Sequence, residues 1–227
     1  MKDNSDEMGL PEKPMANKSL IENQLWHIFN YKRSSFKRVL FVKTSIDNFI
    51  KVFDFGVPLG LWVLKSYLYK RGIEADILDE RLNEVRKEKI DFEKAIEPYD
   101  IIGFSVTTCE VPKVLEKAKR AKEQGKIVII GGLFTRHNER YLLEHEFVDY
   151  VIPGVSFEPL TKLVVALSNG QKFEQIGGIE GIYQRDPSGK IIGKSVWQTD
   201  TLPSIDKSSW DKIIEDYGPY LNNKIDI

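Results

Sequence analysis

Residues 38 to 167 repeat one unit five times: a short apolar run, a turn rich in Gly, Ser, Thr or Pro, and an amphipathic stretch. The apolar runs are residues 38–43, 74–78, 100–105, 126–130 and 149–152. Their spacing of roughly 25 to 35 residues is the spacing of strand-helix-strand units in a parallel sheet. A sheet of this kind is covered by helices on both faces and binds ligands beyond the carboxyl ends of its strands.

The pattern divides the chain into three predicted parts. Residues 37–170 carry the five units and predict an α/β, Rossmann-like domain, a flavodoxin-like doubly wound sheet of five parallel strands in the order 2-1-3-4-5. Residues 1–36 predict a polar leader and an amphipathic helix that packs on this domain. In residues 171–227, Asp-Pro-Ser-Gly between two β-prone arms predicts a β-hairpin, and the rest predicts a connector with no core of its own.

The composition argues against nucleic-acid and membrane partners. The 33 basic residues nearly cancel the 34 acidic ones, so the chain as a whole offers no positive field for phosphate groups or anionic lipid. The sequence contains no run of about 20 apolar residues, and its first residues lack the layout of a secretory signal. The single cysteine, Cys109, cannot form an internal disulfide. These features predict a cytosolic protein.

Small and hydroxyl-bearing residues follow three of the predicted strands. Because the carboxyl ends of parallel strands meet at one edge, we expect these residues to gather there and let a large ligand approach the backbone. The alternative is that each hydroxyl only bonds local backbone at a helix start. The residues are Thr44, Ser45, Ser105, Thr107, Gly131 and Gly132. The first of them open a long connection, residues 44–57, and loops of this length tend to be functional.

The sequence lacks the usual motifs of nucleotide-binding and metal-binding sites. The chain has neither a Gly-x-Gly-x-x-Gly fingerprint after the first strand nor a phosphate-binding Gly-x-x-x-x-Gly-Lys-Ser/Thr loop. His27, His137 and His145 show no metal-binding spacing. Cys109 is either a nucleophile without an identifiable base or a small buried thiol. Asp79 either accepts from a ligand hydroxyl or caps the following helix.

Four segments together resemble a known family, the N-terminal cobalamin (B12)-binding domain of B12-dependent radical SAM enzymes. They are Val-Pro-Leu-Gly-Leu at residues 57–61, the helix-to-strand stretch 67–79, Asp-Ile-Ile-Gly-Phe-Ser-Val-Thr at 100–107 and Ile-Ile-Gly-Gly-Leu at 129–133. The similarity runs from about residue 38 to residue 210. It implies that residues 37–170 bind cobalamin.

The resemblance also assigns site residues. It implies that Ser105 and Thr107 line the pocket for the nucleotide tail, that Gly131 and Gly132 make room for the tail, and that Thr44, Leu59 and Gly60 border the corrin ring, near Ser45. Where the family often reads Gly-Glu-Gly-Glu, only Gly154 and Glu158 correspond. Carriers that ligate cobalt through histidine use Asp-x-His-x-x-Gly after the first strand; this chain has no histidine there, so no protein histidine ligand is expected.

The resemblance stops short of the radical SAM chemistry. That chemistry needs a Cys-x-x-x-Cys-x-x-Cys motif to hold a four-iron cluster, and this chain has one cysteine. Residues 202–210 resemble the lead-in to the catalytic barrel. We therefore expect a cobalamin-binding chain without an iron-sulfur cluster, which binds rather than catalyses and works with a radical SAM catalytic domain or chain.

Two alternatives come from other functional classes. A receiver-like signalling or protein-interaction module on the same fold would have acidic residues after the first strand and an Asp at the end of the third. Lys43-Thr-Ser45 and Ser105-Val-Thr107 stand there instead. The second alternative is a small-molecule enzyme that uses Cys109.

Overall fold

The structure is a computed structural model that describes residues 36–46, 56–154, 156–196 and 203–221. The predicted leader and first helix lie outside these residues. The described strands are β1 (Val39–Lys43), β2 (Ala75–Asp79), β3 (Ile101–Ser105), β4 (Ile127–Gly131), β5 (Tyr150–Ile152), β6 (Tyr183–Arg185) and β7 (Ile191–Gly193). The described α-helices are α2 (Leu59–Tyr69), α3 (Glu80–Arg86), α4 (Phe92–Ile96), α5 (Val111–Glu123), α6 (Glu139–Leu143), α7 (Phe157–Ser168), α8 (Phe173–Ile176) and α9 (Lys207–Leu221).

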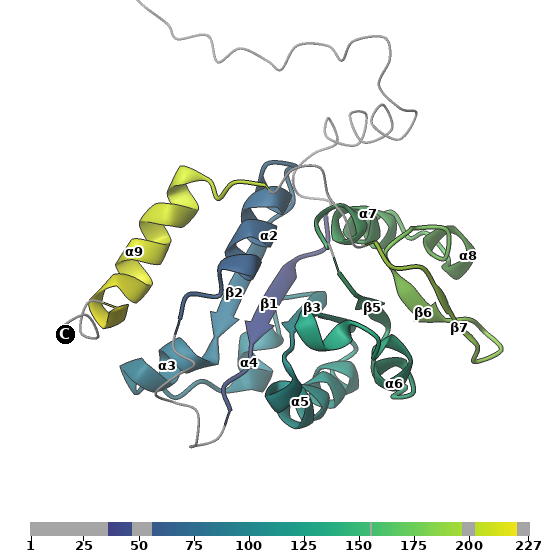
Figure 1. Ribbon diagram of the computed structural model, residues 1–227, viewed down its shortest axis with the longest axis horizontal. Helices are drawn as coiled ribbons and strands as arrows, with labels where there is room; N and C mark the ends of the chain where they lie inside the picture. Colours follow the sequence, from purple (N-terminus) through teal and green to yellow (C-terminus); the bar gives the residue numbers. More distant parts are fainter. Residues whose placement is uncertain (1–35, 47–55, 155, 197–202, 222–227) are drawn as a thin grey trace, which may run out of the picture. The chain divides into compact units, whose positions relative to one another are not determined.

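The strands form one mixed sheet in the order β2-β1-β3-β4-β5-β6-β7 (Figure 1). The first five pair in parallel and in the predicted order 2-1-3-4-5, which confirms the α/β fold class. The predicted hairpin is also present as β6 and β7, closed by a turn in which Asp186 Oδ1 accepts from the backbone N–H groups of Ser188 and Lys190 at 2.8 and 2.9 Å. The hairpin joins the sheet itself, because β6 pairs antiparallel with β5.

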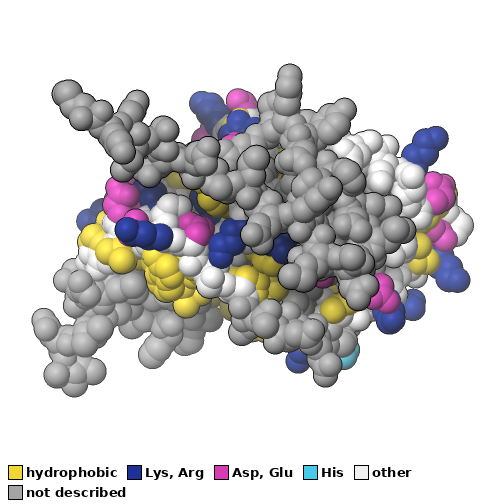
Figure 2. All heavy atoms as spheres, turned by 90° about the horizontal axis from the view of Figure 1, so that it is seen from above, with side chains coloured by type: hydrophobic (Ala, Val, Ile, Leu, Met, Phe, Trp, Pro, Cys, Tyr) yellow, Lys and Arg dark blue, Asp and Glu magenta, His cyan; other side chains and the backbone are white. Residues whose placement is uncertain are grey.

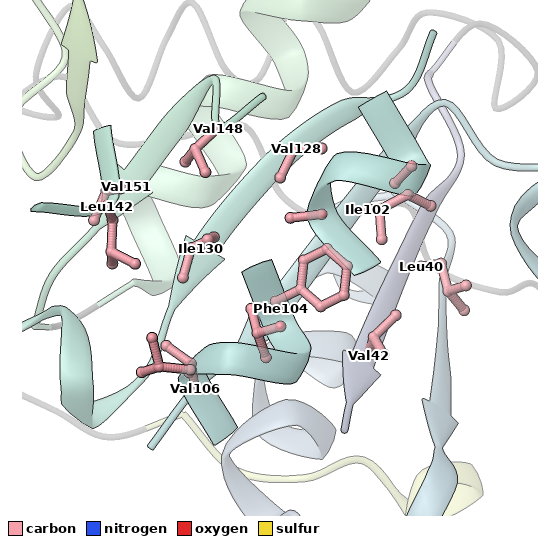
Figure 3. Packing of buried hydrophobic residues seen from close by; sticks show 14 of the residues in the cluster. Leu40, Val42, Ile102, Phe104, Val106, Val128, Ile130, Leu142, Val148 and Val151 are labelled. Carbon is pink, nitrogen blue, oxygen red and sulfur yellow. The ribbon is translucent and has the colours of Figure 1, made fainter. Parts of the chain in front are cut away.

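One face of the sheet is filled by large apolar side chains. Even-numbered residues of β1, β3 and β4 point to this face, among them Val42, Phe104 and Ile130 (Figure 3). They pack against buried residues of α4, α5 and α6 such as Phe92 and Val114. A parallel strand buried on both faces reads as an unbroken apolar run, which is why these strands were visible in the sequence.

The odd-numbered residues of the same strands point to the opposite face, which α2 and α7 cover. Here β1 carries Phe41, β3 carries Gly103 beside it, and β4 carries Ile129 beside Gly103. Tyr67 of α2 and Phe157 of α7 contact each other with ring centroids 5.5 Å apart. The small residues of β3 and β4 leave space between the sheet and the two helices.

Two segments differ from the sequence-based expectation. The charged, helix-prone residues 81–97 predict one helix, but the structure has two short ones, because Lys87 adopts a left-handed conformation with φ of 58° and ends α3. The Asp91 side chain then caps α4 by accepting from Lys94 N at 3.2 Å.

The segment predicted as a connector forms α9 and packs on the domain. Ile213 and Tyr217 are buried against Trp62 of α2 and Leu82 of α3. The Tyr217 hydroxyl donates to Asp79 Oδ2 at 2.9 Å. These buried contacts tie the C-terminal helix to the β2 edge of the sheet.

No helix in the described ranges is long and apolar enough to cross a membrane. On the face shown in Figure 2, both basic and acidic side chains appear among the visible described atoms, beside stretches of hydrophobic side chains.

Candidate functional site

A cavity of about 470 Å3 lies between the sheet and helices α2 and α7. Its volume falls within the roughly 300–1,000 Å3 of small-molecule sites. Six of the predicted site residues line it: Gly60, Ser105, Thr107, Gly131, Gly132 and Gly154. The structure thus brings residues from α2, from the ends of β3 and β4, and from the segment after β5 to one place.

The other four predicted site residues do not line this cavity. Thr44 is fully buried, and its hydroxyl has no hydrogen-bond partner among the described residues. Ser45 is buried beside a separate polar depression, where its N–H donates to Glu80 Oε2 at 3.3 Å. Leu59 is 47% exposed, and Glu158 pairs with Lys162 at 2.9 Å on the surface of α7.

The sequence patterns missed most of the cavity wall. Several apolar side chains line it that were not singled out: Phe41, Leu61, Leu64, Ile129, Leu133, Ile152, Phe157 and Leu160. Gly103 and Arg136 were also missed. Gly103 carried a signal, because a glycine inside a strand often marks the close approach of a ligand or of another group.

Glycine occupies positions 132 and 60 of the cavity for different physical reasons. A Cβ on Gly132 would lie 2.6 Å from Val106 N and 2.7 Å from Val106 O, and the residue has φ of 98°. Gly132 is therefore required by the protein backbone itself. A Cβ on Gly60 would meet no protein atom within 4 Å, although glycine in a helix costs about 1 kcal/mol relative to alanine. No described protein contact explains Gly60.

A buried ion pair holds the loop that carries Thr107. The Glu110 side chain is fully buried and pairs with Lys43, the last residue of β1. Its other oxygen accepts from Thr107 N at 2.7 Å and from Thr107 Oγ1 at 2.8 Å. The Thr107 hydroxyl thus donates within the protein, whereas the Ser105 hydroxyl has no hydrogen bond with a described residue and lies next to Gly132.

The structure decides between the two interpretations of Asp79. Its Oδ1 accepts from Arg81 N at 3.1 Å and from Arg81 Nε at 3.0 Å, and its Oδ2 accepts from Arg81 and Tyr217. Burial, followed by the charge of Asp79, raises the pKa of Tyr217. Asp79 is therefore a helix cap in a buried network rather than a group open to a ligand.

Cys109 and the described histidines do not line the cavity and belong to no group of described residues that could hold a metal ion. Cys109 is exposed, so the interpretation as a buried thiol is wrong; its recorded contact is the Thr107 hydroxyl at 3.5 Å, which is not a base. His145 stacks on Phe147 with ring centroids 5.1 Å apart. Among the described residues no His, Cys, Asp and Glu side chains gather in a group that could hold a metal ion, and no described histidine lines the cavity.

Comparison with known families identifies the domain. Residues 47–164 match the B12 binding domain family. The chain belongs to this family. The matched residues run from the β1–α2 connection into α7, and they include most of the described cavity wall. No curated protein sequence matches the chain.

Solved structures share the fold of this B12-binding domain. One is the radical S-adenosylmethionine methyltransferase TsrM from Kitasatospora setae with cobalamin and a [4Fe-4S] cluster bound, with a TM-score of 0.56 and 20% identity over 75% of this chain. Another is the cobalamin-dependent S-adenosylmethionine radical enzyme OxsB with aqua-cobalamin bound, with a TM-score of 0.57 and 19% identity over 86% of this chain. The chain spans 31% of the length of each.

Proposed function

We propose that this chain binds cobalamin with the nucleotide tail in the cavity between the sheet and helices α2 and α7. The observation that carries the proposal is a cavity whose wall combines apolar side chains with Gly60, Gly103 and Gly131, in a chain of the B12-binding family. Whole cobalamin is much larger than 470 Å3, so the cavity can take only a part of it. The corrin ring would lie over the carboxyl ends of the strands.

The residues present fit a ligand of this chemistry. Gly60 leaves open space where any other residue would place a side chain, and no described protein atom uses that space. Arg136 is the only charged residue among the described residues that line the cavity. The nucleotide tail of cobalamin carries a phosphodiester, and arginine is well suited to hold a phosphate. Ser105, Thr107, Gly131, Gly132 and Gly154 complete the proposed contacts.

We assign the remaining predicted site residues to contacts with the corrin ring. Leu59 is half-exposed one residue before Gly60, and Leu133 is 83% exposed at the cavity rim. Such apolar side chains in solvent are what a flat ring could cover. Thr44, Ser45 and Glu158 stay predictions, and they would contact the ring or its side groups rather than the tail.

Cobalt ligation by a protein histidine forms no part of the proposal. The segment after β1 lacks the Asp-x-His-x-x-Gly motif, and no described histidine lines the cavity. When bound, cobalamin supplies methyl-transfer or radical-assisting chemistry. This chain's own residues would hold the cofactor and shield its tail from water.

We further infer that the domain works with a radical SAM catalytic domain or chain in the cytosol. The structures with the same fold carry S-adenosylmethionine chemistry in longer chains. The single cysteine of this sequence cannot build the three-cysteine cluster site, so that site would come from elsewhere. Residues 37–170 would form the cobalamin-binding part, with residues 171–227 leading from it.

A spectroscopic experiment tests the proposal. Purified protein is mixed with hydroxocobalamin and desalted, and the visible spectrum of the protein fraction is recorded. We expect retained corrinoid absorbance in the wild type, loss in Gly60→Leu, and retention in Gly218→Leu, a matched substitution on α9 where a Cβ meets only ordinary contact. A colourless wild-type fraction would overturn the proposal.

A further inference from the structure

The inner part of the cavity is apolar on every described side. Phe41 and Ile129 form its floor on the sheet, and Leu61 and Leu160 form its walls on the helices. Each of these residues is at most 5% exposed. A group that enters this part of the cavity is therefore surrounded by carbon.

The sheet backbone on the cavity floor is already hydrogen-bonded. Phe41 pairs with Gly103 and Gly103 pairs with Ile129 in the parallel ladders, so the N–H and C=O groups of these residues are used within the sheet. On the helix walls, the N–H groups of Leu61 and Leu160 donate to Pro58 O and Ser156 O, each at 2.9 Å.

The polar side chains among the described lining residues lie at the carboxyl side of the sheet. Ser105 ends β3, and Thr107, Arg136 and Ser156 lie in the segments that follow β3, β4 and β5. The cavity is thus divided into a polar entrance, suited to the sugar and phosphate of a nucleotide, and an apolar interior, suited to its base.

We propose that this interior selects corrinoids by their lower base, accepting dimethylbenzimidazole and discriminating against adenine; the inference rests on the proposed function. Dimethylbenzimidazole presents two methyl groups and a hydrocarbon ring edge. Adenine presents an amino group and several ring nitrogens, and each polar group buried without a partner weakens binding. With the penalties typical of one such group, the expected difference in affinity is tenfold or more.

Three corrinoids separate the outcomes by titration calorimetry with the full chain: cyanocobalamin, its analogue with adenine as the lower base, and cobinamide, which has no nucleotide. We expect cyanocobalamin to bind at least tenfold more tightly than either of the others. Equal affinity for all three would overturn the inference while leaving corrinoid binding intact. An adenine analogue that binds as tightly as cyanocobalamin, with cobinamide weaker, would also overturn it. Binding of none of them would overturn the proposed function.

A pair of variants tests where the selection arises. Leu64→Gln places an amide on the α2 wall of the cavity. We expect it to reduce the ratio of the binding affinity for cyanocobalamin to that for the adenine analogue at least threefold. Leu115→Gln is the matched control, a half-buried leucine on α5 at the opposite face of the sheet, and should leave the ratio unchanged. An unchanged ratio in a folded Leu64→Gln protein, checked by circular dichroism, would overturn the assignment.

Discussion

Replacing Glu110 by glutamine should destabilise the protein strongly. The carboxylate is fully buried and accepts three hydrogen bonds, one from the Lys43 ammonium and two from Thr107. A glutamine amide has one oxygen and one NH2 group, so either Lys43 or Thr107 would face a donor instead of an acceptor. The Lys43 side chain, 10% exposed, would also lose the counter-ion of its ammonium group.

The expected magnitude follows from these contacts. Removing one partner of a buried ion pair costs about 3–5 kcal/mol, because the other charge stays buried and uncompensated. Natural domains unfold at a cost of about 5–15 kcal/mol, so Glu110→Gln should remove a large share of the total. We expect Lys43→Met alone to cost a similar amount, since Glu110 would keep only its Thr107 donors.

A double-mutant cycle measured by urea unfolding, followed by circular dichroism at pH 7, checks the argument. The variant with both Lys43→Met and Glu110→Gln should be less destabilised than the sum of the two single variants by about 2 kcal/mol or more. Glu180→Gln is the control, because Glu180 pairs with Lys194 on the surface and should change little. Single variants that each cost under about 1 kcal/mol and add within about 0.5 kcal/mol would refute the reasoning.

Three further results are expected. Tyr217→Phe removes the buried hydrogen bond to Asp79 and should lower the free energy of unfolding by about 1.5–3 kcal/mol in urea; no change would mean that water replaces the hydroxyl. Burial raises the pKa of Asp206, but hydrogen bonds from neighbouring serine hydroxyls and a backbone N–H outweigh it and hold the pKa below its ordinary value. The stabilisation from Asp206 is therefore present above about pH 4 and is lost as the pH falls further. Between pH 2 and pH 6, the melting temperature of Asp206→Asn should therefore depend less on pH than that of the wild type. Parallel curves of melting temperature against pH for the two proteins would contradict this. Gly132→Ala forces a Cβ against the Val106 backbone and should destabilise the protein by about 1–3 kcal/mol in the same urea assay; an unchanged unfolding midpoint would contradict this.

The parallel sheet could be predicted closely from the sequence, because its signal is local. Each of the five strands begins and ends within one residue of its apolar run. The pairing of β6 with β5 is a contact between distant segments and has no such signal. Part of what fixes it is Arg185, whose guanidinium donates to backbone carbonyls of residue 143 at the end of α6 and of residues 145, 146 and 148 after it.

Helix α9 escaped prediction for a different reason. Its buried residues Ile213 and Tyr217 stand four apart, as a helix face requires, but Gly218 and Pro219 follow them and look like a helix end. The contacts with Trp62 and Leu82 supply the missing stabilisation. Tertiary packing therefore overrides the local signal in this segment.

Only part of the cavity lining could be predicted from the sequence. The position of a residue along a strand indicates which edge of the sheet it lies near, but not which face it points to. Residues that follow the strands share the carboxyl edge, yet only those directed toward α2 and α7 line the cavity. Ser105 and Gly131 point to that face, and the segment after β1 turns Ser45 toward Glu80 instead. The hydroxyl pattern could not separate these two cases.

Alternation along β3 explains why this cavity lies on the face of the sheet that α2 and α7 cover. In residues 101–105 the even positions Ile102 and Phe104 fill the core, while Gly103 and Ser105 leave the opposite face open. A Cβ on Gly103 would lie 3.0 Å from the Phe41 ring, so this glycine lets the ring lie across β3 as the cavity floor. The apolar run of β3 thus predicts a strand buried on both faces and also contains Gly103. Because this residue has no side chain, it leaves room for the cavity on the odd-numbered face of the strand.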